Sequence, residues 1–125
     1  MEDVTKWFND GENLYTFSQW DEAISRFRNV IEVEPNNLRA RLRIGLALAH
    51  KGLHEQAIEE YKKILMIDDK YIDAYYNLGW SYYHDLKDIS EAVKYWSEVV
   101  RLDLQDTATK KWLDKAIAER EKLQS

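Results

Sequence analysis

The chain has 125 residues, of which 45% are hydrophobic and 13% aromatic. This length and composition exclude a disordered chain and suit one domain with a continuous core. The net charge is −5, and no lysine or arginine stripe is present to neutralise phosphates, which argues against nucleic-acid binding. The strongest run of cations, Arg39, Arg41 and Arg43, is short, and at helical spacing Arg41 points away from the other two.

Cysteine is absent, which rules out disulfides, zinc ribbons and thiol nucleophiles. No apolar stretch approaches the roughly 18 residues of a membrane span. The N-terminal residues 1–6 are polar and acidic and do not lead into an apolar run, unlike a signal peptide. We therefore expect no membrane contact and a cytoplasmic location.

The chain has one proline and four glycines, and its apolar residues recur at helical spacing. This pattern predicts helices at about residues 4–17, 20–33, 37–51, 54–67, 71–84, 89–102 and 107–122. Gly52 is expected to end the third helix in a left-handed conformation. Pro35 is expected to stop the second helix, with residues 36–37 offering an N-cap to the next. Residues 85–88 are expected to form a lengthened turn.

Equivalent residues recur with a period of 34. The first helix of each unit carries a glycine, followed three residues later by a larger residue: Gly11 and Leu14, Gly45 and Leu48, Gly79 and Tyr82. The second helix carries an alanine, an aromatic and a β-branched residue, one residue late in the third unit: Ala23, Phe27 and Val30; Ala57, Tyr61 and Ile64; Ala92, Trp96 and Val99. Because small and large residues alternate as interlocking helices require, the pattern predicts antiparallel helix pairs.

These helix pairs resemble the tetratricopeptide repeat. The first unit meets the motif of that family at Trp7, Gly11, Leu14, Ala23, Phe27 and Pro35, and the third unit at residues 74–79, Tyr82, Ala92 and Trp96. The resemblance implies an all-α fold over residues 1–125 as a single domain: a right-handed α-solenoid of three repeats, at about 4–37, 38–71 and 72–106, with a C-terminal capping helix at 107–122. Departures from the motif occur at Asp10, Arg41, Asp69 and Leu104, and the first two put only the local packing in question.

The last helix, residues 107–122, has no partner helix in the repeat pattern. Its apolar side carries Leu113, Ala116, Ile117 and Trp112, and its other side is charged. A half-polar helix of this kind covers the bare face that a stack of repeats leaves at its end. The alternative is a linker helix that leads to a dimer partner or to a further domain.

The resemblance implies that the first helix of each unit lines a concave groove that binds a peptide or a partner protein. The residues expected to make the contacts are Phe8, Arg39, Leu42, Arg43, Leu46, Tyr76, Asn77, Trp80 and Tyr83. The aromatic and leucine members are too apolar for an inert surface, Asn77 can pair with a peptide backbone, and Arg39 and Arg43 could grip a carboxylate. In the plainer alternative, Tyr76, Asn77 and Tyr83 are repeat consensus residues and Arg39 pairs with Asp73.

One subfamily of such proteins binds the acidic C-termini of heat-shock chaperones through a clamp of Lys, Asn, Asn, Lys and Arg. The corresponding positions of this sequence hold Phe8, Glu12, Arg43, Asp73 and Asn77. None of them matches and two are acidic, so a chaperone-tail adaptor is disfavoured.

We expect no catalytic residues, no metal site and no cofactor, and hence no enzyme. The isolated glycines form no phosphate loop, the serines fit no nucleophile motif, and His50, His54 and His84 are interpreted as surface residues. Two other interpretations stay open. One is a self-associating structural protein that forms a homo-oligomer, and the other is a designed repeat protein without a natural partner, against which the irregular third unit argues.

Overall fold

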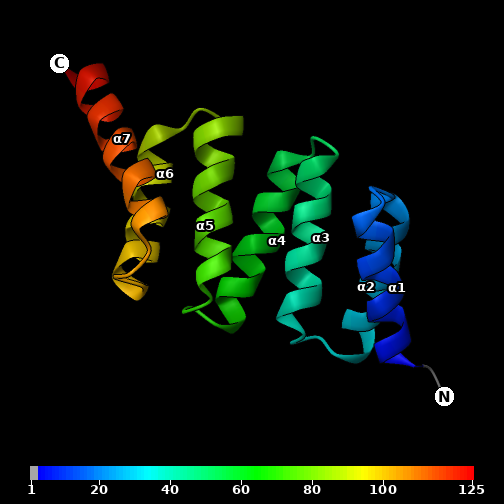
Figure 1. Ribbon diagram of the computed structural model, residues 1–125. Coiled ribbons are helices and arrows are strands. Elements are labelled where there is room, and N and C mark those ends of the chain that lie inside the picture. Colours follow the sequence, from blue (N-terminus) through cyan, green and yellow to red (C-terminus); the bar gives the residue numbers. More distant parts are fainter. Residues whose placement is uncertain (1–2) are drawn as a thin grey trace. The chain divides into compact units, whose positions relative to one another are not determined.

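The computed structural model describes residues 3–125, and within them every regular element is a helix (Figure 1). The predicted all-α helical-repeat fold is therefore confirmed. The chain divides into two compact units: the N-terminal unit, which ends at Ile67, and the C-terminal unit, Asp68–Ser125. The prediction of a single domain over the whole chain stays a prediction. Met1 and Glu2, which contributed to the polar N-terminal stretch, lie outside the described residues.

The N-terminal unit contains the first two predicted repeats. Its helices are α1 (Val4–Thr16), α2 (Trp20–Val33), α3 (Leu38–His50) and α4 (His54–Ile67). Helix α1 packs on α2, α3 packs on α4, and α2 also packs on α3. Each predicted boundary in this unit lies within one residue of the observed one. Asn37 caps α3 as expected, because its side-chain oxygen accepts a hydrogen bond of 3.1 Å from the backbone N–H of Ala40.

The C-terminal unit contains the third repeat and the closing helix. Its elements are α5 (Ile72–Trp80), a π-helical segment η1 (Ser81–Asp85), α6 (Ile89–Leu102) and α7 (Thr107–Gln124). Helix α6 packs against α5 on one side and α7 on the other. Within the described residues, no helix of either unit combines the length and the apolar character that crossing a bilayer would require.

The extra residue of the third repeat lies in η1, so the predicted lengthened turn at residues 85–88 is wrong. The turn that follows each first helix has the same length: 17–19, 51–53 and 86–88. A π-helical turn holds one more residue than an α-helical turn. Accordingly, the N–H of Leu53 donates to the carbonyl of Leu48, five residues back, whereas the N–H of Asp88 donates to Tyr82, six residues back.

All three turns place one residue in the left-handed region of the backbone. Gly52 has a φ of 83°, as predicted, while the equivalent positions hold Ser18 at 61° and Lys87 at 57°. Glycine adopts this conformation without steric cost, whereas side chains disfavour it. The turn geometry of the repeat is therefore maintained even where the sequence lacks the glycine that favours it.

In each repeat, a glycine of the first helix packs against a buried aromatic ring of the second helix. Phe27 and Trp96 have no exposed surface and Tyr61 is 1% exposed. A Cβ atom built on each glycine would approach the ring to 2.8 Å for Gly11–Phe27, 2.5 Å for Gly45–Tyr61 and 2.3 Å for Gly79–Trp96. The predicted burial of equivalent aromatic residues is confirmed, and the glycines are explained by close helix approach.

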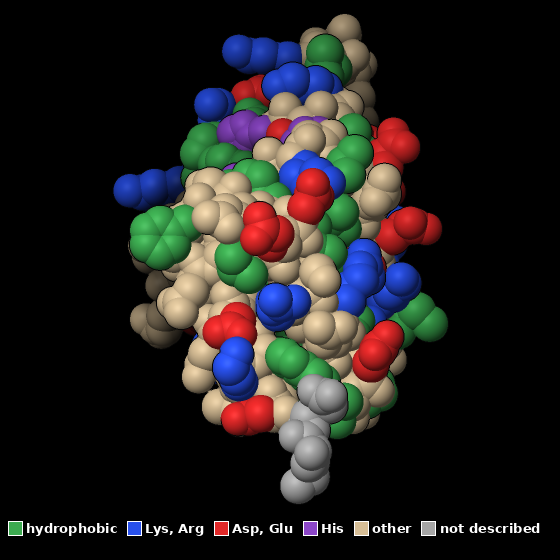
Figure 2. Space-filling view, turned by 90° about the vertical axis from the view of Figure 1, so that its right-hand side faces the viewer, with side chains coloured by type: hydrophobic (Ala, Val, Ile, Leu, Met, Phe, Trp, Pro, Cys, Tyr) green, Lys and Arg blue, Asp and Glu red, His purple; other side chains and the backbone are tan. Residues whose placement is uncertain are grey.

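The two departures that put local packing in question are accommodated at the surface. Asp10 forms an ion pair of 3.1 Å with Lys6, one turn earlier on α1. Arg41 donates from Nε to the carbonyl of Pro35 at 2.7 Å, which ties α3 to the preceding turn. Seen from the α1–α2 side, acidic and basic side chains are interspersed rather than gathered into one patch (Figure 2).

Candidate functional site

The predicted contact residues lie on two surfaces, one in each unit. The α1–α3 face, in the N-terminal unit, comprises Phe8, Glu12, Tyr15, Arg39, Leu42, Arg43 and Leu46. The aromatic face, in the C-terminal unit, comprises Tyr76, Asn77, Trp80, Tyr83, His84 and Trp112. All nine contact residues expected from the sequence fall on one of these two faces.

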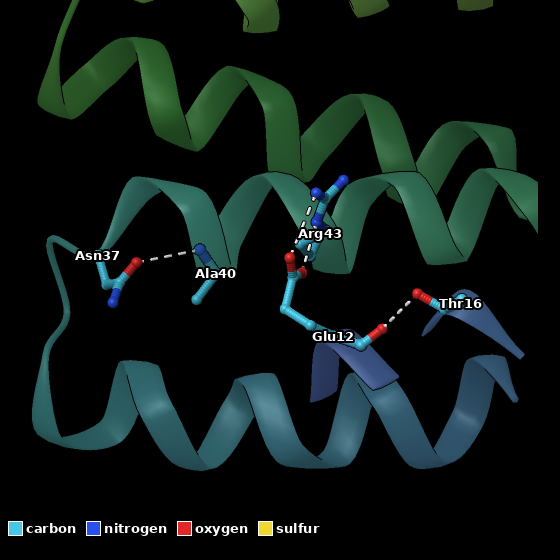
Figure 3. Close-up of polar contacts among 5 residues, drawn as sticks. All are labelled: Glu12, Thr16, Asn37, Ala40 and Arg43. Atoms are coloured by element: carbon cyan, nitrogen blue, oxygen red, sulfur yellow. Dashed lines mark hydrogen bonds and ion pairs between the residues drawn. The ribbon is translucent and has the colours of Figure 1, made fainter. Parts of the chain in front are cut away.

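A salt bridge between Arg43 and Glu12 joins α3 to α1 (Figure 3). The Nε of Arg43 lies 2.6 Å from Oε1 of Glu12 and the Nη2 lies 3.4 Å from Oε2. The guanidinium also lies 5.1 Å from the ring centroid of Tyr15, and burial raises the pKa of that phenol while Arg43 opposes the rise. Because the carboxylate of Glu12 already neutralises the guanidinium of Arg43, Arg43 is a weaker anchor for a ligand carboxylate than the sequence suggested.

Arg39 lies at the other end of the α1–α3 face. Its guanidinium is exposed and lies 5.0 Å from the ring centroid of Phe8, which in turn meets Phe27 edge-on at 5.5 Å. A shallow cavity of about 180 Å³ is lined by Val4, Thr5, Phe8, Glu34, Asn37 and Arg39. Leu42 and Leu46, one turn apart on α3, are half-buried. This face combines apolar surface with one available cation.

Trp80 is the centre of the aromatic face. Its side chain is 37% exposed, although its ring meets three others. The distances between ring centroids are 6.3 Å to Tyr76, 3.8 Å to His84 and 5.4 Å to Trp112. Helices α5 and α7 and the segment η1 thus hold a cluster of packed aromatic rings with Trp80 open to solvent.

Tyr83 belongs to the aromatic face, but its hydroxyl is turned toward α7. Its ring centroid is 5.3 Å from that of Trp96 and 6.0 Å from that of Trp112, and its hydroxyl donates to the carboxylate of Glu119 on α7. Burial and this carboxylate raise the pKa of Tyr83 to about 12. Tyr83 therefore links η1 to α7, and its hydroxyl is already engaged.

We expect the stability of the C-terminal unit to fall between pH 10 and pH 12, because the phenol of Tyr83 ionises at lower pH in the unfolded chain than in the folded one. Below pH 10 both states hold the proton and the contribution of Tyr83 is intact. Urea unfolding monitored by circular dichroism from pH 9 to pH 12 measures the decline. The decline should be shallower in Tyr83→Phe, and equal slopes in the two proteins would contradict this assignment.

Asn77 uses part of its hydrogen-bonding capacity within its own helix. Its side-chain amide donates to the backbone carbonyl of Asp73 at 2.8 Å. This bond fixes the orientation of the amide group on α5, next to Tyr76. A fixed amide is suited to pairing with a peptide backbone because little side-chain entropy is lost on binding.

The contact residues expected from the sequence did not include Trp112 and His84, which belong to the aromatic face. His84 is half-buried rather than a surface residue, and burial is the main cause that lowers its pKa. Its ring centroid lies 5.1 Å from that of Trp112. A usable signal was present, because continuing the repeat register beyond the third unit with its extra residue places Trp112 at the position of Asn77. Among residues 3–125, no cluster of three or more His, Cys, Asp or Glu side chains could hold a metal ion.

Comparison with known proteins identifies similar repeats. A tetratricopeptide-repeat family profile matches residues 9–74, and a second profile of the same description matches residues 73–103. The peroxisomal targeting signal receptor of Kluyveromyces lactis is 34% identical over 71 residues, which are 57% of this chain and 12% of that protein. Tetratricopeptide repeat protein 13 of Homo sapiens is 37% identical over 70 residues, which are 55% of this chain and 8% of that protein. The matched part is thus about a tenth of the length of these relatives.

Solved structures with the same fold cover nearly the whole chain. The Sgt2 TPR domain from Aspergillus fumigatus has a TM-score of 0.86 at 20% identity, covering 99% of this chain and 83% of that one. The first TPR domain of Spaghetti, bound to an HSP90 peptide, has a TM-score of 0.84 at 19% identity, covering 98% and 94%. YrrB, a TPR protein with an unusual peptide-binding site, has a TM-score of 0.79 at 21% identity, covering 89% and 57%. At these identities the likeness shows the fold alone.

Proposed function

Because the chain belongs to the tetratricopeptide-repeat family, we propose that it is a protein-interaction scaffold that binds a peptide or a partner protein through the first helices of its repeats. Two structures of the same fold support this function: the Spaghetti domain is bound to an HSP90 peptide, and YrrB has a peptide-binding site. The proposed location is cytoplasmic, the proposed domain is the whole chain, and no catalytic role is assigned.

The exposure of Trp80 is the observation that carries the proposal. A tryptophan that is 37% exposed, in a cluster held by α5, η1 and α7, offers a large apolar surface without loss of side-chain freedom on binding. Such aromatic anchors dominate binding energies at protein interfaces. The proposed contact residues are those of the two faces: Phe8, Arg39, Leu42, Arg43, Leu46, Tyr76, Asn77, Trp80 and Tyr83.

Within this set the structure suggests different roles. Trp80 and Tyr76 provide apolar surface, Asn77 provides hydrogen bonds, and Arg39 provides a charge that no ion pair occupies within the described part of the N-terminal unit. Tyr83 adds a half-buried ring to the aromatic face and positions the ring of Trp112, which it meets at a centroid distance of 6.0 Å.

We expect Trp80→Ala to abolish capture of the partner while leaving helicity intact, because the ring is removed from the surface and α5 retains a good helix former. Affinity capture from a lysate, compared between wild type and variant by quantitative mass spectrometry, measures the loss. Circular dichroism of both proteins monitors the fold.

The matched control is Leu104→Ala, which removes a large side chain that is 80% exposed, lies between α6 and α7 and is not one of the residues of the aromatic face. This variant should capture the partner as wild type does. Retained capture by Trp80→Ala would refute the placement of the site. If light scattering instead shows a dimer at micromolar concentration that Trp80→Ala dissociates, the same surface serves self-association, which is the alternative function.

A further inference from the structure

Helix α7 extends the surface of α5 around Trp80 as well as covering the core of the third repeat. Thr109 is 1% exposed, Leu113 is 8% exposed and Ala116 is fully buried, so these residues form the side that packs on α6. Continuing the repeat register from α5 to α7 places Lys111, Trp112 and Lys115 at the positions of Tyr76, Asn77 and Trp80. The ring of Trp112 meets that of Trp80 at 5.4 Å, which shows that the two positions lie side by side.

A hollow on the exposed side of α7 is lined by Thr107, Ala108, Lys111, Trp112 and Lys115, and its volume is about 390 Å³. Two cations and one indole face this hollow, and no carboxylate lines it. The ammonium of Lys115 lies 5.2 Å from the ring centroid of Trp112. Within residues 68–125, neither lysine has a carboxylate within ion-pair distance.

This local excess of positive charge contrasts with the chain as a whole, whose net charge is −5. Other charged groups of the unit lie around the aromatic face. Glu119 is bonded to Tyr83, and Asp85, Lys87, Lys115 and Glu119 act on the pKa of His84. The positive charge of the unpaired lysines complements carboxylates on a ligand. The exposed part of the indole between them complements a bulky apolar side chain that such carboxylates flank.

The geometry points to an acidic peptide segment of another protein as the ligand of the C-terminal unit, with carboxylates at Lys111 and Lys115 and a leucine-sized side chain against Trp112 and Trp80. This inference rests on the proposed function and specifies the chemistry of its partner. The lysines select the charge of the segment, and the two indoles supply most of its buried area. Binding therefore weakens as salt screens the two ion pairs.

The test uses fluorescence anisotropy of a synthetic, fluorescein-labelled peptide in which two leucines stand between runs of aspartate. We expect the full chain to bind this peptide and Lys111→Gln/Lys115→Gln to bind it about tenfold more weakly, equivalent to about 1.4 kcal/mol. The matched control, Lys110→Gln/Lys122→Gln, removes the same charge from exposed positions of α7 that do not line the hollow. It should bind as wild type does. Thermal unfolding of all three proteins confirms that they are folded.

Two further peptides separate the elements of the inference. Replacing aspartate by asparagine should weaken binding to wild type, and replacing leucine by serine should weaken it further. The inference would be overturned if the peptide did not bind, or if the two lysine variants bound it with equal affinity. It would also be overturned if the serine peptide bound as well as the leucine peptide, because that result indicates a general attraction of anions. If partner capture depends on Trp80 but not on Lys111 and Lys115, the acidic partner is wrong and the scaffold function stands. If capture is unaffected by Trp80→Ala, the scaffold site itself is refuted.

Discussion

Replacing Gly79 by alanine is expected to destabilise the C-terminal unit by about 3 kcal/mol, which lowers its melting temperature by about 10 °C or more. The added methyl carbon would lie 2.3 Å from Cδ1 and Nε1 of Trp96, which has no exposed surface into which it could move. The indole N–H also donates to the carbonyl of Tyr76 at 3.2 Å, and displacement of the ring would break this bond. These costs exceed the gain of about 1 kcal/mol from replacing glycine by alanine in a helix.

Thermal and urea unfolding of the three equivalent variants provides an internal control. The destabilisation should decrease in the order Gly79, Gly45, Gly11, because the corresponding approaches to the aromatic rings are 2.3, 2.5 and 2.8 Å. In a Trp96→Phe background, Gly79→Ala should cost less, since the smaller ring relieves the clash. An unchanged or raised stability of Gly79→Ala would show that α5 and α6 do not approach as closely as described.

The repeat period made most of the fold predictable. Equivalent residues of successive repeats are expected to be buried alike, and the pairing of small with aromatic residues identified the interior. Phe27, Tyr61 and Trp96, which are 34 and 35 residues apart, are all buried. The position of the extra residue was not predictable in this way. An inserted residue can be accommodated by a π-helical turn within the helix or by a longer turn after it, and the contacts at the two ends of the helix decide between them. Here the turn at residues 86–88 has the same length as the equivalent turns of the other repeats.

The candidate surfaces were predictable in position but not in chemistry. The repeat register places Arg43 and Trp80 on first helices, yet the register does not reveal that Glu12 neutralises Arg43 or that Tyr83 turns inward to Glu119. These contacts depend on side-chain reach across neighbouring helices, which a periodic pattern does not encode. Trp112 packs against the core cluster, as its place on the apolar side of the helix predicted, but the pattern did not reveal that its ring also meets that of Trp80.

Deleting residues 107–125 is expected to unfold the C-terminal unit, because α7 covers the buried cluster of α6 that contains Trp96 and Val99. Loss of the burial of Leu113 and Ala116, together with exposure of the α6 side chains beneath them, costs about 5 kcal/mol or more. This is as large as the total stability of many small domains. The hydrogen exchange rate of the Trp96 indole N–H, measured by NMR, reports directly on this unit, and the rate should approach that of an unfolded chain.

The deletion distinguishes a capping helix from a linker helix, the two interpretations that the sequence left open. Removing only residues 121–125, all of which are exposed, should leave exchange at Trp96 slow. Protection of Trp96 in the chain that ends at Asp106 would show that α6 does not need α7, and α7 would then be a linker. The capping interpretation has the stronger physical basis, because a stack of repeats whose last apolar face meets water loses the burial that stabilises its final helix pair.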